Sequence, residues 1–315
     1  MNIVCVESLG IQKARFETLR AHYAAQGHTF NYYLDRREDE ATLVERMREA
    51  DVVVVSNIKL PAAVLAQCAH LKYLSVAFTG LDHIDLAYCR EHGIEVQNAA
   101  GYSTTAVSEL AVGMMLDLLR NIVTLHELTR QGGGRGQFLG RELRGKTVGI
   151  VGTGAIGLAT ARLLLAFGAK VIAWSRTERP EAKARGITYM PLDDLLRQSD
   201  TVSLHVPLCD DTRGLIGERE LALMQPTALL VNTARGPVCD IAAVAKALTE
   251  GRIAGAAFDV FEQEPPLPLD HLLLSSGRCL VTPHVAFATE ESFAARADIV
   301  FGHVDQWLAR TAAKA

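Results

Sequence analysis

Residues 146–176 read KTVGIVGTGAIGLATARLLLAFGAKVIAWSR, and this stretch decides the fold. A short apolar run of strand length, Val148–Val151, precedes three glycines with the spacing G-x-G-x-x-G. Apolar residues at helical spacing follow, Gly168 ends that helix, and Val171–Trp174 predicts a second strand parallel to the first. Strand, glycine turn, helix and strand in this order are typical of a unit that binds the pyrophosphate of a dinucleotide.

Each glycine of the turn has a separate physical task. Gly152 permits the tight turn, Gly154 lets the backbone approach the phosphates, and Gly157 lets the helix pack closely on the strand. The helix that starts here offers unpaired N–H groups and a partial positive charge to an anion. A glycine turn without a ligand is the structural alternative, and the strand and helix around this turn favour the binding site.

The end of the second strand bears on the choice between NAD and NADP. Sites that prefer NAD usually carry an acid here, which accepts hydrogen bonds from the ribose hydroxyls. This strand instead ends in Ser175, Arg176 and Thr177, and the first acid is Glu178. Because a guanidinium can form paired, charge-assisted hydrogen bonds to a 2′-phosphate, we predict that NADP(H) is preferred and that NAD(H) is possible. An Arg176 that only points into solvent is the alternative.

Length, charge and cysteine content limit the possible classes of protein. A chain of 315 residues with 49% hydrophobic residues suits two domains of ordinary size. A net charge of −4 argues against nucleic acid or an anionic membrane as a partner. The six cysteines form no C-x-x-C pair and are expected to be buried free thiols. The chain starts in a strand, Ile3–Val6, without a secretion signal, so we expect a cytoplasmic protein.

Strand and helix patterns alternate along the whole chain. Four consecutive valines, Val52–Val55, predict a buried parallel strand, and the repeated alternation predicts an α/β fold. A long helix is expected from about Ser103 to Thr129, followed by a glycine-rich loop at 131–136. Gly140–Thr147 matches the pattern of a P-loop, but a strand follows it where a P-loop needs a helix, so we expect no nucleoside triphosphate there.

Polar residues gather at the ends of predicted strands in the second half, where open α/β sheets bind ligands. Arg235, Asp259, Glu264 and His284 are the candidates for one cleft. Reduction of a 2-keto acid needs a cation for the carboxylate and an acid for the developing alkoxide. Arg235 suits the first task, a histidine suits the second, and Glu264 could hold that histidine in its protonated form. A surface Arg, a core His and a solvated Glu are the structural alternatives.

Several motifs in this order resemble the D-2-hydroxyacid dehydrogenases over essentially the whole chain. Besides the glycine turn, the matching stretches are Phe78–Asp85, Gly101–Thr104, His205–Thr212, Asn232–Gly236, Phe258–Pro266 and Thr282–His284. The resemblance implies a flavodoxin-like substrate domain (1–98 plus 287–315) and a Rossmann cofactor domain (99–286), two doubly wound parallel-sheet domains with the active site in the cleft between them. It also implies a homodimer formed through the cofactor domain, in which the apolar helix after Ser103 would serve.

The same resemblance assigns roles to individual residues. Arg235 would bind and polarise the substrate, His284 would be the acid and base, and Glu264 its partner, while the amides around Thr79 and Gly80 would hold the substrate carboxylate. His205 is a rival base, but the match places it beside the cofactor. The predicted cofactor-binding residues are Gly152, Gly154, Ala155, Ile156, Gly157, Ser175, Arg176, His205, Val206, Pro207, Thr233, Ala234 and Asp259. No pattern of histidines indicates a metal.

The resemblance implies a hydride transfer between NADP(H) and a small 2-keto or D-2-hydroxy acid of the glyoxylate or hydroxypyruvate type. An NAD(H)-dependent enzyme for another substrate, such as D-lactate or D-glycerate, and a non-catalytic, nucleotide-sensing scaffold remain alternatives. Phe287 departs from the family pattern, because a small residue is common after the catalytic histidine, and it could narrow the substrate pocket.

Overall fold

The computed structural model describes residues 1–313 and divides the chain into two compact units. Unit 1 comprises Met1–Ser103 together with the chain from Ala288 onward, and unit 2 comprises Thr104–Phe287. Each unit has its own parallel sheet, which confirms the predicted class of two α/β sheets. The predicted bounds of a substrate-binding domain (1–98 plus 287–315) and a dinucleotide-binding domain (99–286) stay a prediction.

Unit 1 is built on a five-stranded parallel sheet in the order β2-β1-β3-β4-β5, which is the flavodoxin-like order. Its strands are β1 (Asn2–Cys5), β2 (Thr29–Tyr32), β3 (Val52–Val55), β4 (Tyr73–Val76) and β5 (Glu95–Asn98). Its helices are α1 (Lys13–Ala25), α2 (Glu40–Met47), α3 (Ala62–Leu65), α4 (Leu86–Glu91) and, at the far end of the chain, α12 (Glu290–Ala312).

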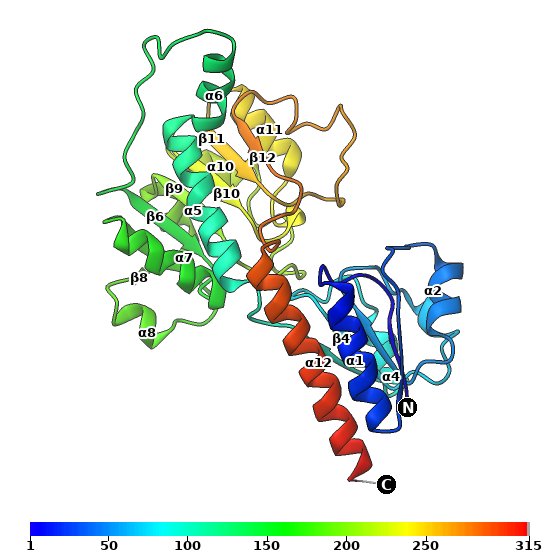
Figure 1. Cartoon of the computed structure of the whole chain (residues 1–315). Coiled ribbons are helices and arrows are strands. Elements are labelled where there is room, and N and C mark those ends of the chain that lie inside the picture. Colours follow the sequence, from blue (N-terminus) through cyan, green and yellow to red (C-terminus); the bar gives the residue numbers. More distant parts are fainter. Residues whose placement is uncertain (314–315) are drawn as a thin grey trace. The chain divides into compact units, whose positions relative to one another are not determined.

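Helix α12 joins the last part of the chain to the first sheet, and Figure 1 shows it beside α1. The Trp307 ring stacks on Tyr73 of β4 with 5.2 Å between ring centroids, and the Ser75 hydroxyl donates to the Val300 carbonyl at 3.0 Å. All four valines of β3 are fully buried, as expected for a strand covered on both faces.

Unit 2 contains a seven-stranded parallel sheet in the order β12-β11-β10-β9-β6-β7-β8, a Rossmann arrangement with one further strand. Its strands are β6 (Thr147–Val151), β7 (Lys170–Trp174), β8 (Thr188–Tyr189), β9 (Thr201–Leu204), β10 (Leu229–Asn232), β11 (Gly255–Phe258) and β12 (Cys279–Val281). Its helices are α5 (Thr104–Arg120), α6 (Ile122–Arg130), α7 (Ala155–Ala166), α8 (Pro180–Lys183), α9 (Leu192–Gln198), α10 (Glu218–Leu223), a 3₁₀ turn at Gly236–Val238 and α11 (Ile241–Thr249).

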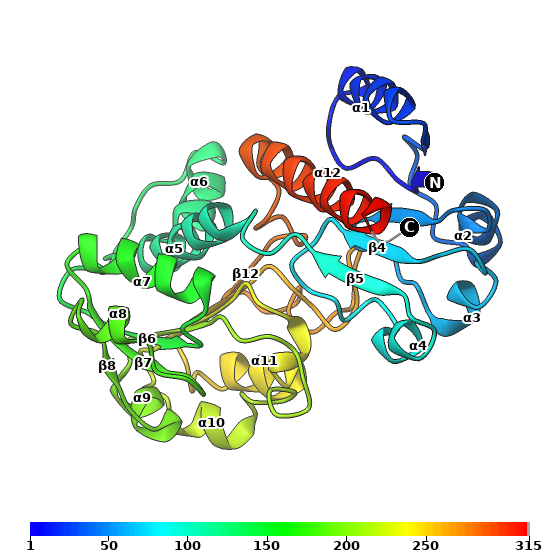
Figure 2. The ribbon, with the colours of Figure 1, turned by 90° about the horizontal axis from the view of Figure 1, so that it is seen from below.

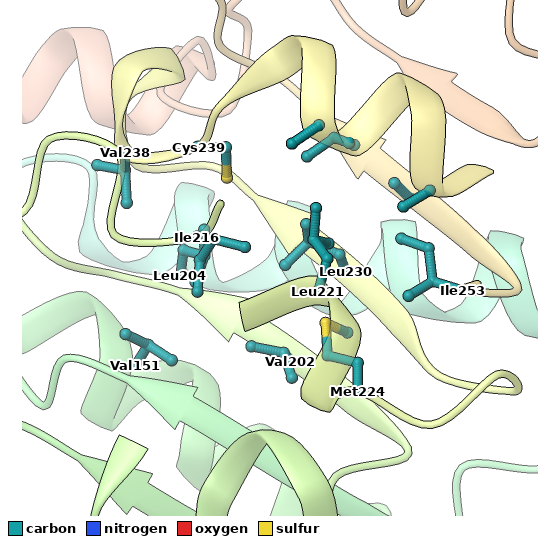
Figure 3. Close-up of a cluster of buried hydrophobic side chains, with 14 of the residues drawn as sticks. Val151, Val202, Leu204, Ile216, Leu221, Met224, Leu230, Val238, Cys239 and Ile253 are labelled. Carbon is teal, nitrogen blue, oxygen red and sulfur yellow. The ribbon is translucent and has the colours of Figure 1, made fainter. Parts of the chain in front are cut away.

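Helices cover both faces of this sheet, with α5 and α7 on one side and α9, α10 and α11 on the other (Figure 2). Successive strand residues point to opposite faces, so Val148 and Ile150 of β6 pack in one buried cluster and Val151 in the other. Figure 3 shows the second cluster, in which Val202 and Leu230 meet residues of α10 and α11. The central unit predicted from residues 146–176 is confirmed by β6, α7 and β7.

Two expectations were wrong in detail. The single helix expected over about 103–129 is broken between α5 and α6 at Asn121, whose φ of 48° lies in the left-handed region that asparagine tolerates. The six cysteines are free, but Cys209 is exposed, because it follows β9 in a loop and not in a strand. None of the helices in residues 1–313 is long and apolar enough to cross a lipid bilayer.

Candidate active site

The glycine turn between β6 and α7 leaves no room for a side chain at two of its three glycines. Gly152 has a φ of 99°, and a Cβ on it would lie 2.6 Å from the His205 carbonyl oxygen. A Cβ on Gly157 would lie 2.0 Å from the Gly152 carbonyl oxygen, whereas a Cβ on Gly154 would meet nothing within 4 Å. Gly154 is the N-cap of α7, so the open side of the turn faces the unpaired amides of that helix. This geometry fits a dinucleotide pyrophosphate.

The segment after β7 lies directly beside this turn. The Gly152 amide donates to the Trp174 carbonyl at 2.7 Å, which ties the turn to the end of β7. Ser175 is half-buried and Arg176 is exposed. Within residues 1–313 the Arg176 guanidinium has no hydrogen bond or ion pair, and Glu178 pairs with Lys183. An unpaired cation therefore stands where the ribose of a bound dinucleotide is expected.

His205 packs directly against the glycine turn. Its Nε2 lies 2.9 Å from the Ser203 hydroxyl, and burial lowers the pKa of His205 from its ordinary value near 6.5 to about 4. The ring is therefore neutral at neutral pH, and a neutral imidazole is too weak an acid to protonate a substrate efficiently. Val206 is buried next to it, and the Pro207 carbonyl accepts from the Thr212 hydroxyl at 2.6 Å.

The lowered pKa of His205 should make the stability of the protein depend on pH. Below pH 6.5 the His205 ring is protonated in the unfolded chain, whereas in the folded chain it becomes protonated only near pH 4. The free energy of unfolding therefore decreases as the pH falls through this window. At pH 5 the free energy of unfolding is about 2 kcal/mol lower than at neutral pH. We expect His205→Gln to reduce the difference in urea midpoint between pH 7.5 and pH 5, and the exposed His126→Gln to leave it unchanged. Equal pH dependence in wild type and His205→Gln would contradict this.

The loop after β10 carries Arg235 and is held by a buried asparagine. The Asn232 side chain accepts from the Ala234 amide at 3.0 Å and donates to the Arg235 carbonyl at 2.9 Å, so one amide group fixes both ends of the turn. The Arg235 Nη1 also donates to the Ala234 carbonyl at 2.8 Å. Thr233 is buried, and among the described residues its hydroxyl has no hydrogen-bond partner. A buried hydroxyl of this kind is suited to a ligand.

Asp259, directly after β11, holds the turn that carries His284. Its carboxylate accepts from the Thr282 hydroxyl at 2.5 Å and from the amides of Val285 and Ala286 at 2.9 and 2.8 Å. Burial raises the pKa of Asp259, and these three hydrogen bonds oppose that rise. The carboxylate therefore holds a side chain before His284 and two backbone amides after it. Its predicted contact with the cofactor stays a prediction.

His284 and Glu264 form a hydrogen-bonded pair. The His284 Nδ1 lies 2.7 and 2.9 Å from the two Glu264 carboxylate oxygens, and 10% of the His284 side chain is exposed. Because a carboxylate only accepts, Nδ1 carries the hydrogen, and exchange of a proton with a ligand falls to Nε2. His284 has a φ of 55°, a backbone strain that often marks functional residues. The Phe287 ring packs edge-on against the imidazole with 5.4 Å between centroids.

The loops that carry these residues follow adjacent strands. Strand β11 pairs with both β10 and β12, so Arg235, Asp259 and His284 follow three neighbouring strands at their carboxyl ends. A Cβ on Gly236 would lie 2.0 Å from the Phe261 backbone, which shows how closely the Arg235 loop approaches the segment leading to Glu264. Unit 2 thus gathers the predicted cation, acid and carboxylate on one edge of its sheet.

In the loop after β4 in unit 1, hydrogen bonds hold two backbone carbonyls and leave the following amides available to a ligand. The Thr79 carbonyl accepts from the Asn98 side chain at 2.6 Å, and the Phe78 carbonyl accepts from the Ala99 amide at 3.1 Å. A trans peptide points its carbonyl and the following N–H in opposite directions, so the Thr79 and Gly80 amides face away from these partners. Among residues 1–313 neither amide donates a hydrogen bond. Two such amides suit an anion.

His83, in the same motif, has a structural contact. Its Nε2 lies 2.9 Å from the Ser56 carbonyl, and its ring packs edge-on against Phe78.

Sequence reasoning did not assign roles to Asn98, Asn232 or Ser203. An asparagine at the end of a strand was the available signal for the first two, since such residues often fix turns. The described residues contain no group of three or more His, Cys, Asp or Glu side chains that could hold a metal ion.

Comparison with known proteins agrees with this geometry. The family model of the D-isomer specific 2-hydroxyacid dehydrogenase, NAD binding domain, matches residues 112–286. The chain belongs to this family. It is 40% identical to a glyoxylate reductase of Thermococcus litoralis over 268 residues, 82% of this chain and 80% of that protein. It is 30% identical to a hydroxypyruvate reductase of Blautia hydrogenotrophica over 291 residues, 90% of both chains.

Solved structures extend the similarity to the whole fold. An acyclic imino acid reductase in complex with NADPH and D-Arg aligns with a TM-score of 0.89 at 27% identity, covering 98% of both chains. A D-2-hydroxyisocaproate dehydrogenase aligns with a TM-score of 0.83 at 29% identity, covering 99% of this chain and 98% of that one. The chain is therefore an NAD(P)-dependent dehydrogenase of the 2-hydroxyacid family, with a Rossmann domain for its nicotinamide cofactor.

Proposed function

We propose that this dehydrogenase reduces a small 2-keto acid of the glyoxylate or hydroxypyruvate type to the D-2-hydroxy acid and prefers NADP(H). The observation that carries the proposal is the His284–Glu264 pair, 2.7 Å apart, on the same sheet edge as Arg235. The names of the relatives from Thermococcus litoralis and Blautia hydrogenotrophica support the substrate class.

In this proposal each residue has one role in binding the substrate or in transferring the proton. A bound nicotinamide supplies the hydride. Arg235 holds the substrate carboxylate with its planar fork and polarises the ketone. The His284 Nε2 gives its proton to the developing alkoxide, and Glu264 stabilises the imidazolium through Nδ1. The proton returns from solvent after the product leaves. The Thr79 and Gly80 amides hold the carboxylate as further donors.

The preference for NADP(H) rests on the segment after β7. Ser175 and the exposed Arg176 would hold the 2′-phosphate, and the segment holds no acid before Glu178, which pairs with Lys183. Gly154, Ala155 and Ile156 would hold the pyrophosphate. The NADPH in the complex of the related imino acid reductase is consistent with this choice.

Replacing Arg176 by Ala tests the cofactor preference. We expect KM for NADPH to rise about tenfold or more, because a charge-assisted pair is lost, and KM for NADH to stay within about twofold. Steady-state kinetics with both cofactors at saturating keto acid measure this. Arg252→Ala, which removes an exposed cation on the surface of unit 2, serves as the control. Comparable efficiency with both cofactors, unchanged in Arg176→Ala, would overturn the preference.

Replacing Asn98 by Ala tests the carboxylate-binding amides. The Thr79 carbonyl would lose its 2.6 Å hydrogen bond, so the Gly80 amide would lose its fixed direction. We expect KM for the keto acid to rise about 5- to 10-fold, with KM for NADPH unchanged. Gln97→Ala is the matched control, because it removes a 2.9 Å side-chain bond to Tyr73 from the neighbouring position of β5. Equal effects of the two variants would exclude a special role for Asn98.

A steady-state screen of several 2-keto acids with NADPH and NADH in parallel tests the activity itself. Falling absorbance of the reduced nicotinamide on addition of glyoxylate or hydroxypyruvate is the expected result. Turnover only when an amine is added with the keto acid would favour reduction of an imino acid, a second candidate that the 0.89 TM-score to such an enzyme supports. No turnover with any acid, together with cofactor binding, would favour a nucleotide-sensing scaffold.

Homodimerisation is proposed on the surface of unit 2. The apolar residues of α5 are mostly buried in the unit itself, whereas α6 exposes Ile122, Val123 and Leu128. The dimer contact is therefore assigned to α6 and the segment after it, where Leu139 is 81% exposed.

A further inference from the structure

A chain of hydroxyl groups joins the glycine turn to the segment that follows β7. The Arg179 amide donates to the Tyr189 hydroxyl at 3.1 Å, and this hydroxyl donates to the Thr153 hydroxyl at 2.9 Å. The Thr153 hydroxyl donates to the Thr177 carbonyl at 3.5 Å. The chain begins and ends in residues 177–179, so it fastens this segment from both ends.

Tyr189 is the central link of this chain. A hydroxyl donates one hydrogen, and that of Tyr189 goes to Thr153 while its oxygen accepts from Arg179. Thr153 is the residue between Gly152 and Gly154, and only 1% of it is exposed. Tyr189 itself stands on β8, the edge strand that pairs with β7. The hydroxyl of one tyrosine thus connects an edge strand with the turn expected to hold the pyrophosphate.

The segment held in this way carries one cation, Arg179, and directly follows another, Arg176. Arg176 and Arg179 are both exposed, and within residues 1–313 neither side chain has a hydrogen bond or ion pair. Glu178, the acid between them, pairs with Lys183 and is thereby partly neutralised. A mobile cationic segment loses conformational entropy when it binds an anion, whereas a segment already fixed loses less.

We propose that Tyr189 is a positioning residue for cofactor choice, which fixes residues 177–179 through Thr153 and so presents the preceding Arg176 to the 2′-phosphate of NADP(H). The proposal rests on the proposed preference for NADP(H) and deepens it. Tyr189 acts through Arg176 and does not itself contact the phosphate. The Thr153 link sets the distance between the 2′-phosphate site and the pyrophosphate site.

Binding of 2′,5′-ADP and 5′-ADP, measured by calorimetry without substrate, tests this role. Wild type should bind 2′,5′-ADP more tightly than 5′-ADP. In Tyr189→Phe the affinity for 2′,5′-ADP should fall about fivefold, and that for 5′-ADP should stay within about twofold. Tyr73→Phe is the matched control, because it removes a 2.9 Å hydroxyl bond to Gln97 in unit 1 and should change neither affinity.

A double-mutant cycle with Arg176→Ala separates positioning from general support. If Tyr189 acts through Arg176, Tyr189→Phe should change the affinity for 2′,5′-ADP less than about twofold in the Arg176→Ala background. Additive losses, or equal weakening of both ligands by Tyr189→Phe, would overturn the inference. Discrimination by wild type that Tyr189→Phe leaves intact would also overturn it while leaving the preference for NADP(H) standing. No discrimination by wild type would overturn the preference, and the inference with it.

Discussion

Replacing His284 by Ala is expected to lower kcat for the keto acid about 10²- to 10⁴-fold, which is the range for loss of a positioned general acid. The proton of the new hydroxyl group would then have to come from water. The affinity for NADPH should stay within about twofold, because His284 follows β12, away from the glycine turn after β6. Single-turnover measurements of nicotinamide oxidation, with cofactor affinity from fluorescence titration, separate these two effects.

A second histidine–glutamate pair provides the control. His271 lies 3.2 Å from Glu262 through Nε2 and, like His284, exposes 10% of its side chain. It therefore matches His284 in burial and in the type of partner, but it stands in the loop before β12. His271→Gln should keep kcat within about twofold of wild type. Similar losses in both variants would mean that the loop and not the acid had been damaged, and near-normal turnover of His284→Ala would refute its role.

The fold could be predicted from the sequence because its signals are local. Four valines in a row, the glycine spacing and the apolar run of α7 each fix one element, and alternation of elements fixes the parallel sheets. The break at Asn121 was missed because no glycine or proline marks it, and the left-handed turn there depends on one asparagine backbone. Strand β8 has only two residues, which is too short for any periodicity.

The site could be predicted only where motifs name the residue types. Arg235, Glu264 and His284 stand in recognisable strings, and the structure places the latter two in direct contact. The residues that orient them come from tertiary packing. In the sequence, nothing distinguishes Tyr189 from other aromatic residues. Only the structure shows that its hydroxyl lies between the Arg179 amide and the Thr153 hydroxyl. The direction of the Gly80 amide likewise depends on Asn98, which lies on the neighbouring strand.

Replacing Arg235 by Ala is expected to lower kcat/KM for the keto acid about 10³-fold, through a higher KM and a lower kcat together. The guanidinium is proposed to bind the carboxylate in the ground state and to stabilise the charge that develops on the ketone oxygen, so both constants should change. Arg235→Lys keeps the charge but loses the planar fork, and should recover only part of the loss. Cofactor affinity should be unchanged in both variants.

The hydrogen bonds that fix the loop around Arg235 do not depend on the arginine side chain. Asn232 fixes the turn through backbone groups of Ala234 and Arg235, so truncation of the arginine side chain leaves these two bonds in place. A thermal midpoint close to that of wild type would therefore attribute the kinetic loss to the guanidinium itself. A rise in KM with unchanged kcat would show that Arg235 binds the carboxylate without polarising the ketone. Unchanged kinetics in Arg235→Ala would remove the cation from the mechanism, and the amides of Thr79 and Gly80 would have to bind the carboxylate without it.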